Sequence, residues 1–227
     1  FWENLKQCFS SRNLGFVIAS HLLFYWINRS TSYSSMGSYY EDMYGLMPHH
    51  RGYIRSYQSV MQFIVQSALI GPVLQFVGGE RQACCLATFG LAIATFAETQ
   101  QSMPLFLAII CPIISLGIAM LTISLKALLT NIAPADSIFS VFAALDVLQN
   151  AAAVTVPFYR TQLFAVLPSR GADSMGMSGD PDAVAWAYSG AVHWLVASCA
   201  MTFLLMQNGE GKRRQPRKQR YTQNKTV

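Results

Sequence analysis

The chain of 227 residues is rich in apolar side chains and poor in charge, with 52% hydrophobic residues, 12% charged residues and a net charge of +5. Soluble domains carry about 25% charged residues. This composition therefore excludes an ordinary water-soluble domain and indicates a membrane protein.

Six apolar stretches predict an all-α, polytopic membrane protein with six transmembrane helices, because a crossing helix needs about 20 mainly apolar residues. In chain order they are residues 14–34, 53–77, 83–97, 104–125, 138–158 and 183–206. The first is interrupted by Asn28 and Arg29, and the third is short. The stretches are longer than the roughly 10 residues of a barrel strand and do not alternate polar with apolar residues, which excludes a β-barrel.

The Lys and Arg residues predict how the helices are oriented. A basic tail follows the sixth stretch, and its positive residues are Lys212, Arg213, Arg214, Arg217, Lys218, Arg220 and Lys225. The positive-inside rule places this tail in the cytoplasm, and six crossings then place the N-terminus there too. We expect a cytoplasmic lead-in (1–13), a transmembrane bundle (14–208) and a basic cytoplasmic tail (209–227). Some positive residues on the outer side count against this orientation: Arg51, Arg55, Arg160 and Arg170.

The basic tail is typical of a topology determinant that contacts anionic lipid, with partner binding or sorting as the alternative. Nucleic-acid binding is not expected, because no folded basic domain surrounds the tail. The five cysteines form no C-x-x-C or zinc spacing and are interpreted as packing residues. The His49–His50 pair has no further ligand nearby. We therefore expect neither a metal nor a cofactor.

The fifth stretch carries Asp146 near its middle, followed by Gln149 and Asn150. The three residues are spaced i, i+3 and i+4, so they share one face of a helix. A carboxylate at the centre of a bilayer costs at least about 2.5 kcal/mol, so it normally faces the bundle interior or water. One interpretation is a proton or substrate site, since loss of solvation favours the neutral acid and lets the group load and release a proton. The alternative is a hydrogen bond that only packs helices together.

Other polar side chains lie within the apolar stretches. Gln62 and Gln66 follow Gln58 at four-residue spacing in the second stretch, which suits either a watery pathway or polar contacts between helices. His21 in the first stretch and His193 in the sixth could relay protons or simply bond to backbone carbonyls. We also expect prolines to interrupt three stretches, at Gly71–Pro72, Pro112 and Pro157.

The layout resembles the C-terminal half, helices seven to twelve, of a major facilitator superfamily transporter. The nearest resemblance is to drug:proton antiporter-like and organic-cation-transporter-like members. It rests on the six stretches, on the turn Gly78-Gly79-Glu80-Arg81, and on the connection from Ala133-Pro134-Ala135-Asp136 to a helix that ends near Pro157. The Gly78–Arg81 turn lacks the second basic residue that is typical of the family's loop.

The resemblance implies a secondary transporter that moves a small organic solute or drug-like molecule by alternating access, coupled to protons through Asp146. It implies that the first, second, fourth and fifth helices line or flank the pathway, and that the third and sixth face lipid. The candidate pathway residues are Asp146, Asn150, Gln149, Gln62, Gln66 and His21. The implied partners are the solute, protons, the lipid bilayer, and either an N-terminal six-helix half or a second copy.

Other classes fit the sequence less well. An intramembrane aspartyl protease needs two intramembrane Asp residues, and only Asp146 is found; a serine protease needs a Gly-x-Ser-Gly-like turn with a His partner, which is lacking. Neither aquaporin Asn-Pro-Ala half-helices nor the mitochondrial-carrier repeat occurs. We therefore do not expect an enzyme. The alternative that stays open is a non-transporting six-helix scaffold or regulator derived from a carrier.

Overall fold

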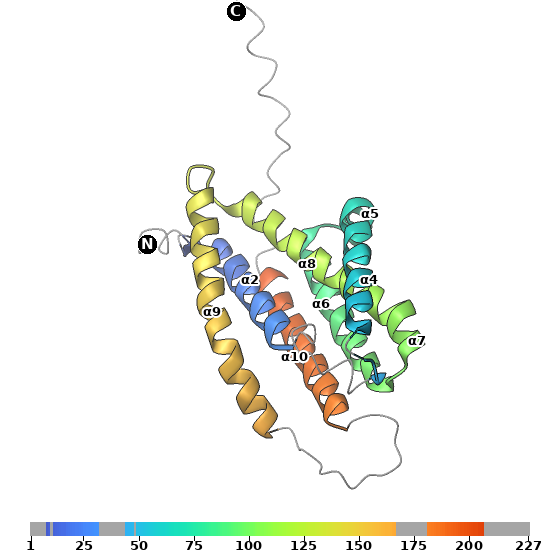
Figure 1. The fold of residues 1–227 in the computed structure, drawn as a ribbon. Helices are drawn as coiled ribbons and strands as arrows, with labels where there is room; N and C mark the ends of the chain where they lie inside the picture. The colour runs from blue at the N-terminus through green and yellow to red at the C-terminus, as the bar shows by residue number, and fades with distance from the viewer. Residues whose placement is uncertain (1–7, 10, 32–43, 48, 167–180, 207–227) are drawn as a thin grey trace, which may run out of the picture.

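The computed structural model describes residues 8–9, 11–31, 44–47, 49–166 and 181–206, and the regular elements in these ranges are helices (Figure 1). The basic tail and most of the lead-in lie outside the described residues. The α-helices are α2 (Arg12–Thr31), α4 (His50–Ile64), α5 (Ile70–Val77), α6 (Glu80–Ala97), α7 (Met103–Leu105), α8 (Cys111–Ile132), α9 (Ile138–Val166) and α10 (Pro181–Met206). Two π-helical turns, η2 (Val65–Leu69) and η4 (Phe106–Ile110), and one 3₁₀ turn, η3 (Glu98–Gln100), complete them.

These elements form six helical rods, because η2 joins α4 to α5 and η4 joins α7 to α8 without a break. Within the described ranges, five helices are long and apolar enough to cross a membrane: Gly52–Val77, Glu80–Gln100, Met103–Ile132, Ile138–Leu163 and Val184–Met206. The prediction of a helical chain with several helices suited to cross a membrane is therefore confirmed, whereas α2, which corresponds to the first of the six predicted spans, is not among the five. The fourth and fifth helices are longer than predicted, since they continue to Ile132 and Val166.

The expectation that prolines interrupt the helices was wrong for Pro157, whereas at Pro72 and Pro112 the regular α-helix does change. Pro157 lies inside the unbroken helix α9, whereas Pro72 and Pro112 each follow a π turn. A proline ring clashes with the carbonyl four residues before it, which here belongs to Ala68 or Ala108. Both of these carbonyls lie inside the π turns, so a local widening of the helix accommodates the ring.

Four rods form the core and two lie outside it. α6 packs against α8 and α10, and α2 packs against the same two helices. The remaining rods lie on opposite sides of this group, with α4 against α8 and α9 against α2 (Figure 1). α6 and α10 also present apolar side chains outward at helical spacing, which suits a lipid-facing surface: Leu86, Phe89, Ile93 and Phe96 on α6, and Val192, Leu195, Val196 and Phe203 on α10.

The contacts of the first three rods are repeated by the last three. In this repeat, α2 corresponds to α8, α4 corresponds to α9, and α6 corresponds to α10. The contact between α2 and α9 then corresponds to the contact between α8 and α4, and the contact between α6 and α8 corresponds to that between α10 and α2. The α2–α8 and α6–α10 contacts each correspond to themselves. Corresponding helices run in opposite directions in Figure 1. The described rods thus form an inverted repeat of three plus three helices.

Two arginines bind the C-terminal carbonyls of neighbouring helices, which lack donors of their own. Arg81, in the turn after Gly78 and Gly79, donates to the carbonyl of Leu205 near the end of α10 (3.0 Å). Gly78 and Gly79 have φ angles of 92° and 120°, which favour glycine. Arg160 of α9 donates to the carbonyls of Arg29 and Ser30 near the end of α2. This contact gives Arg160, which counts against the predicted orientation, a structural role.

Candidate functional site

Among the described helices, α9 packs mainly against α2, and the polar residues in the middle of α9 lie away from this contact. Asp146 and Asn150 are exposed and Gln149 is half-buried, whereas Val141, Ala144 and Leu145 belong to the hydrophobic core. The division into a polar and an apolar face follows the predicted i, i+3, i+4 spacing. Only 17% of the most apolar 18-residue segment of α9 is buried by the rest of the described chain. The side of α9 that carries Asp146 and Asn150 is therefore uncovered within the described chain.

The rod built from α4, η2 and α5 is even more open, since only 6% of its most apolar part is buried, against 50% for α6. Gln62 is half-buried in α4 and Gln66 is exposed in η2. The π turn widens the helix at Gln66. The four-residue spacing of Gln58, Gln62 and Gln66 therefore does not place all three side chains on one face. The amide of Gln58 instead lies beside the thiol of Cys111 in α8.

His21 has a different environment, because it is buried in the core of the bundle. Its side chain is 4% exposed and lies beside the backbone of Leu125 in α8. Its Nε2 atom has no hydrogen-bond partner among the described residues. A buried ring nitrogen without a partner is costly, so His21 marks a place where α2 and α8 are joined by a weak polar contact.

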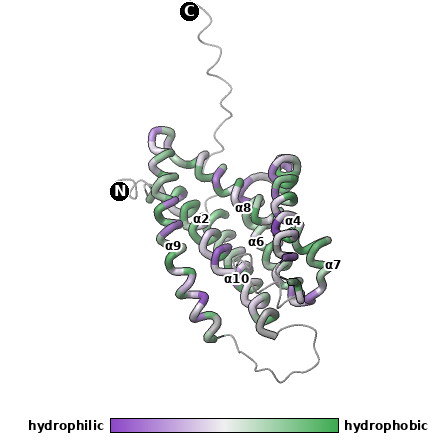
Figure 2. The backbone as a smooth tube through the Cα atoms, in the orientation of Figure 1, coloured by the Kyte–Doolittle hydropathy of each residue, from purple (hydrophilic) through white to green (hydrophobic). Residues whose placement is uncertain are grey.

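The six candidate residues do not converge on one site. Asp146, Gln149 and Asn150 lie on α9, whereas Gln62 and Gln66 lie on the rod at the opposite side of the bundle (Figure 1). Polar segments occur along both rods (Figure 2), and His21 is enclosed between them in α2. The described chain therefore carries its candidate polar residues on two separate rods that flank a core, next to exposed apolar side chains such as Phe63 and Val154. Among the described residues, no group of three or more side chains that could ligate a metal comes together.

A polar junction that the sequence analysis did not predict connects α9 to α2 and α10. The Tyr159 hydroxyl and Nε2 of His193 form a hydrogen bond, while Nδ1 of His193 lies 2.5 Å from the carbonyl of Ser189. Trp26 Nε1 donates to the Thr155 hydroxyl at 2.9 Å, and the Trp26 and Tyr159 rings lie 4.5 Å apart. The i, i+4 spacing of Thr155 and Tyr159 was the available signal in the sequence.

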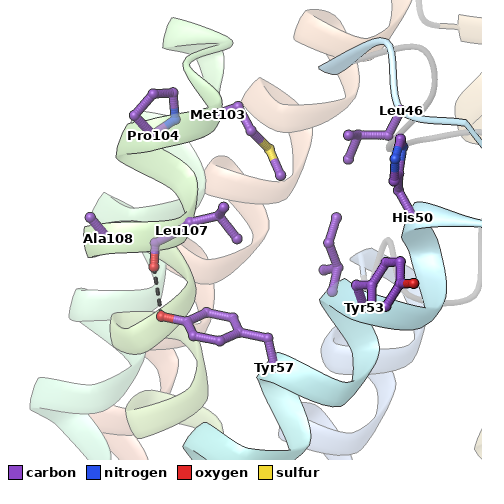
Figure 3. A pocket seen from close by; sticks show the side chains of 9 residues that line it. Leu46, His50, Tyr53, Tyr57, Met103, Pro104, Leu107 and Ala108 are labelled. Atoms are coloured by element: carbon purple, nitrogen blue, oxygen red, sulfur yellow. Dashed lines mark hydrogen bonds between the residues drawn. The ribbon is translucent and has the colours of Figure 1, made fainter.

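A cavity of about 590 Å³ lies between the start of α4 and the helix formed by α7 and η4 (Figure 3). It is lined by Leu46, His50, Tyr53, Ile54, Tyr57, Met103, Pro104, Leu107 and Ala108. The sequence did not reveal this cavity, because the two walls lie about fifty residues apart in the chain and neither wall has an unusual sequence. Glu98, in the 3₁₀ turn η3 that follows α6, is only 2% exposed.

Comparison of the chain with protein family models, curated proteins and solved structures finds no match.

Proposed function

We propose that the chain is one six-helix half of a secondary transporter of the major facilitator type, which moves a small organic solute or drug-like molecule by alternating access. The inverted three-plus-three repeat supports this proposal, because that superfamily nests such a repeat in each half. The observation that carries it is the open polar face of α9 with Asp146 inside a membrane-length helix.

The polar residues of α9 need water or another protein beside them. A carboxylate facing hydrocarbon costs at least about 2.5 kcal/mol, and the exposed Asn150 and Gln66 amides add to the cost. A second six-helix unit, either an N-terminal half or another copy, would cover α4 and α9 and leave water between the units. Asp146, Asn150, Gln149, Gln62 and Gln66 would then face a shared pathway. His21 would reach it only when α2 and α8 move apart.

The proposed mechanism uses the charge of Asp146. Protonation removes that charge and changes the relative free energies of the inward-open and outward-open states, which is how a coupling ion shifts the equilibrium. The amides of Gln62, Gln66 and Asn150 would donate and accept hydrogen bonds with an uncharged or weakly polar solute.

Replacing Asp146 with Asn tests this mechanism in the native polypeptide reconstituted into vesicles. We expect D146N to lose the response of solute flux to an imposed pH gradient, while its yield and thermal unfolding stay unchanged. Flux is measured with a panel of fluorescent organic dyes. The matched control is D136N, because Asp136 is exposed in the turn between α8 and α9. Normal proton-driven flux in D146N contradicts the proposal, and no flux in the parent protein favours the scaffold or regulator alternative.

A further inference from the structure

One wall of the cavity between α4 and η4 contains a backbone carbonyl that its own helix leaves without a hydrogen-bond donor. In η4 the Cys111 N–H bonds to the carbonyl of Phe106, as a π turn requires. Pro112 has no N–H, so the carbonyl of Leu107 lacks both of the backbone donors it would normally use. The Tyr57 hydroxyl supplies the missing donor at 2.8 Å (Figure 3). This bond joins α4 to η4 at the base of the cavity and fixes the distance between its walls.

The lining is apolar apart from a few ring and hydroxyl groups. His50, Tyr53, Ile54 and Tyr57 form the α4 wall at i, i+3, i+4 and i+7, which is one helix face. Met103, Pro104, Leu107 and Ala108 form the opposite wall. Among the residues that the structure describes, no charged side chain belongs to the lining. A volume of about 590 Å³ lies within the range of about 300–1,000 Å³ found for small-molecule sites.

One polar atom of the lining needs a partner. Nδ1 of His50 is buried and has no hydrogen-bond partner among the described residues. Tyr57 already donates its hydroxyl proton to Leu107, so its oxygen can only accept another bond. A ligand with a hydroxyl group can satisfy His50 in either tautomer, because a hydroxyl both donates and accepts.

We infer that this cavity binds a single-chain amphiphile with one uncharged polar group, its chain between Ile54, Met103 and Leu107 and its polar group at His50. The described part of the lining offers no charged side chain, which disfavours a charged head group, since a buried charge needs a partner. The cavity lies where α4 and α7 begin, at the opposite end of the bundle from the Gly78–Gly79 turn (Figure 1). This site is separate from the proposed pathway, because Gln62 lies on another face of α4.

Photolabelling of the full chain with a long-chain alcohol that carries a diazirine group tests the inference. We expect labelled peptides from residues 46–57 and 103–108, and a fall in this labelling of at least about tenfold when A108F fills the cavity from its rim, as occlusion of a small site requires. A second variant, L107W, fills it from the wall. The matched control is A151F, because Ala151 is also an exposed helical alanine, on α9.

The contribution of His50 is tested with two probes of equal length, the alcohol and the corresponding alkane. H50F should lower labelling by the alcohol about fivefold, the effect of one buried hydrogen bond, and leave labelling by the alkane unchanged. An uncharged single-chain lipid that co-purifies with the parent chain but not with A108F identifies the bilayer as the source of the ligand, whereas a co-purifying phospholipid would contradict the inference. Labelling without such a lipid identifies a free amphiphile.

Two results would overturn the inference: equal labelling of the parent, A108F and L107W, or labelling of the outward face of α6 as strong as that of the cavity. Neither result depends on transport, so failure of this site is distinguishable from failure of the proposed function.

Discussion

At the scale of single residues, the chain keeps polar side chains in its membrane helices in two ways. His193 is held by groups from two helices, the hydroxyl of Tyr159 and the carbonyl of Ser189. Asp146 instead lies exposed on α9. A satisfied side chain of the first kind contributes to packing, whereas an exposed carboxylate of the second kind requires water or a partner. This contrast is why we assign His193 to structure and propose a function for Asp146.

The hydrogen bond between Tyr159 and His193 is expected to stabilise the folded protein. Y159F removes the hydroxyl group that bonds to Nε2 of His193, so we expect a loss of about 0.5–1.5 kcal/mol in the free energy of unfolding. The measurement is thermal or denaturant unfolding of the purified protein in detergent. Y188F is the control, because Tyr188 is exposed on α10 and its ring contact with Phe96 survives the change. An equal effect of both variants would contradict the assignment.

At the scale of elements, the distance between α6 and α8 depends on one glycine. A Cβ atom placed at Gly117 of α8 would lie 2.8 Å from Cγ of Leu91 in α6. Real Cβ atoms do not approach other atoms so closely, so the two helices can pack at this distance only while residue 117 has no side chain. This is the close approach that small residues permit between membrane helices.

The substitution G117A should therefore destabilise the protein by about 1–3 kcal/mol, the usual cost of overpacking. G90A is the matched control, because a Cβ atom at Gly90 would meet nothing within 4 Å, and alanine favours a helix by up to about 1 kcal/mol over glycine. Unfolding of both variants in detergent checks the prediction.

A double-mutant cycle isolates the α6–α8 contact. In a background that carries L91A, the cost of G117A should largely disappear, because the clashing side chain has been removed. If G117A costs the same with and without Leu91, the close approach of α6 and α8 at this position is not what limits stability.

At the scale of the whole molecule, two membrane-length rods, α4–α5 and α9, are barely covered by the rest of the described chain. α9 carries Asp146 and Asn150 among exposed apolar side chains such as Val147 and Val154, whereas the exposed large side chains named above for α6 and α10 are all apolar. The outer surface of α9 therefore differs in carrying a carboxylate and an amide, which water or another protein satisfies better than lipid does. The proposal of a missing half or a second copy rests on this difference.

Thiol accessibility tests this difference in intact membranes. In a chain whose five cysteines are replaced by alanine, N150C should react with a water-soluble maleimide, because the proposed pathway contains water. V192C should not react, because Val192 lies on the apolar outer face of α10. Both positions lie within membrane-length helices. Equal reactivity at the two positions, or no reaction at residue 150, would contradict the proposal.

Several features of the fold follow from local properties of the sequence. The length and continuity of each apolar stretch predicted the helical rods, because hydrophobic length is a property of consecutive residues. The spacing of Asp146, Gln149 and Asn150 predicted their shared side of α9, because helical periodicity is equally local. The response of the helices to Pro72 and Pro112 was not predictable in this way. A kink, a break or a π turn each relieves the same clash, and neighbours such as Tyr57 favour one of them.

The sequence by itself determined that this is a helical membrane protein and which residues share each helix face. Only the tertiary structure decided that Asp146 and Gln62 lie on opposite sides of the bundle, that His21 is buried, and that Arg160 binds the end of α2. It also decided that the walls of the α4–η4 cavity meet. The physical reason is that these features depend on contacts between residues far apart in the chain, which helical periodicity does not encode.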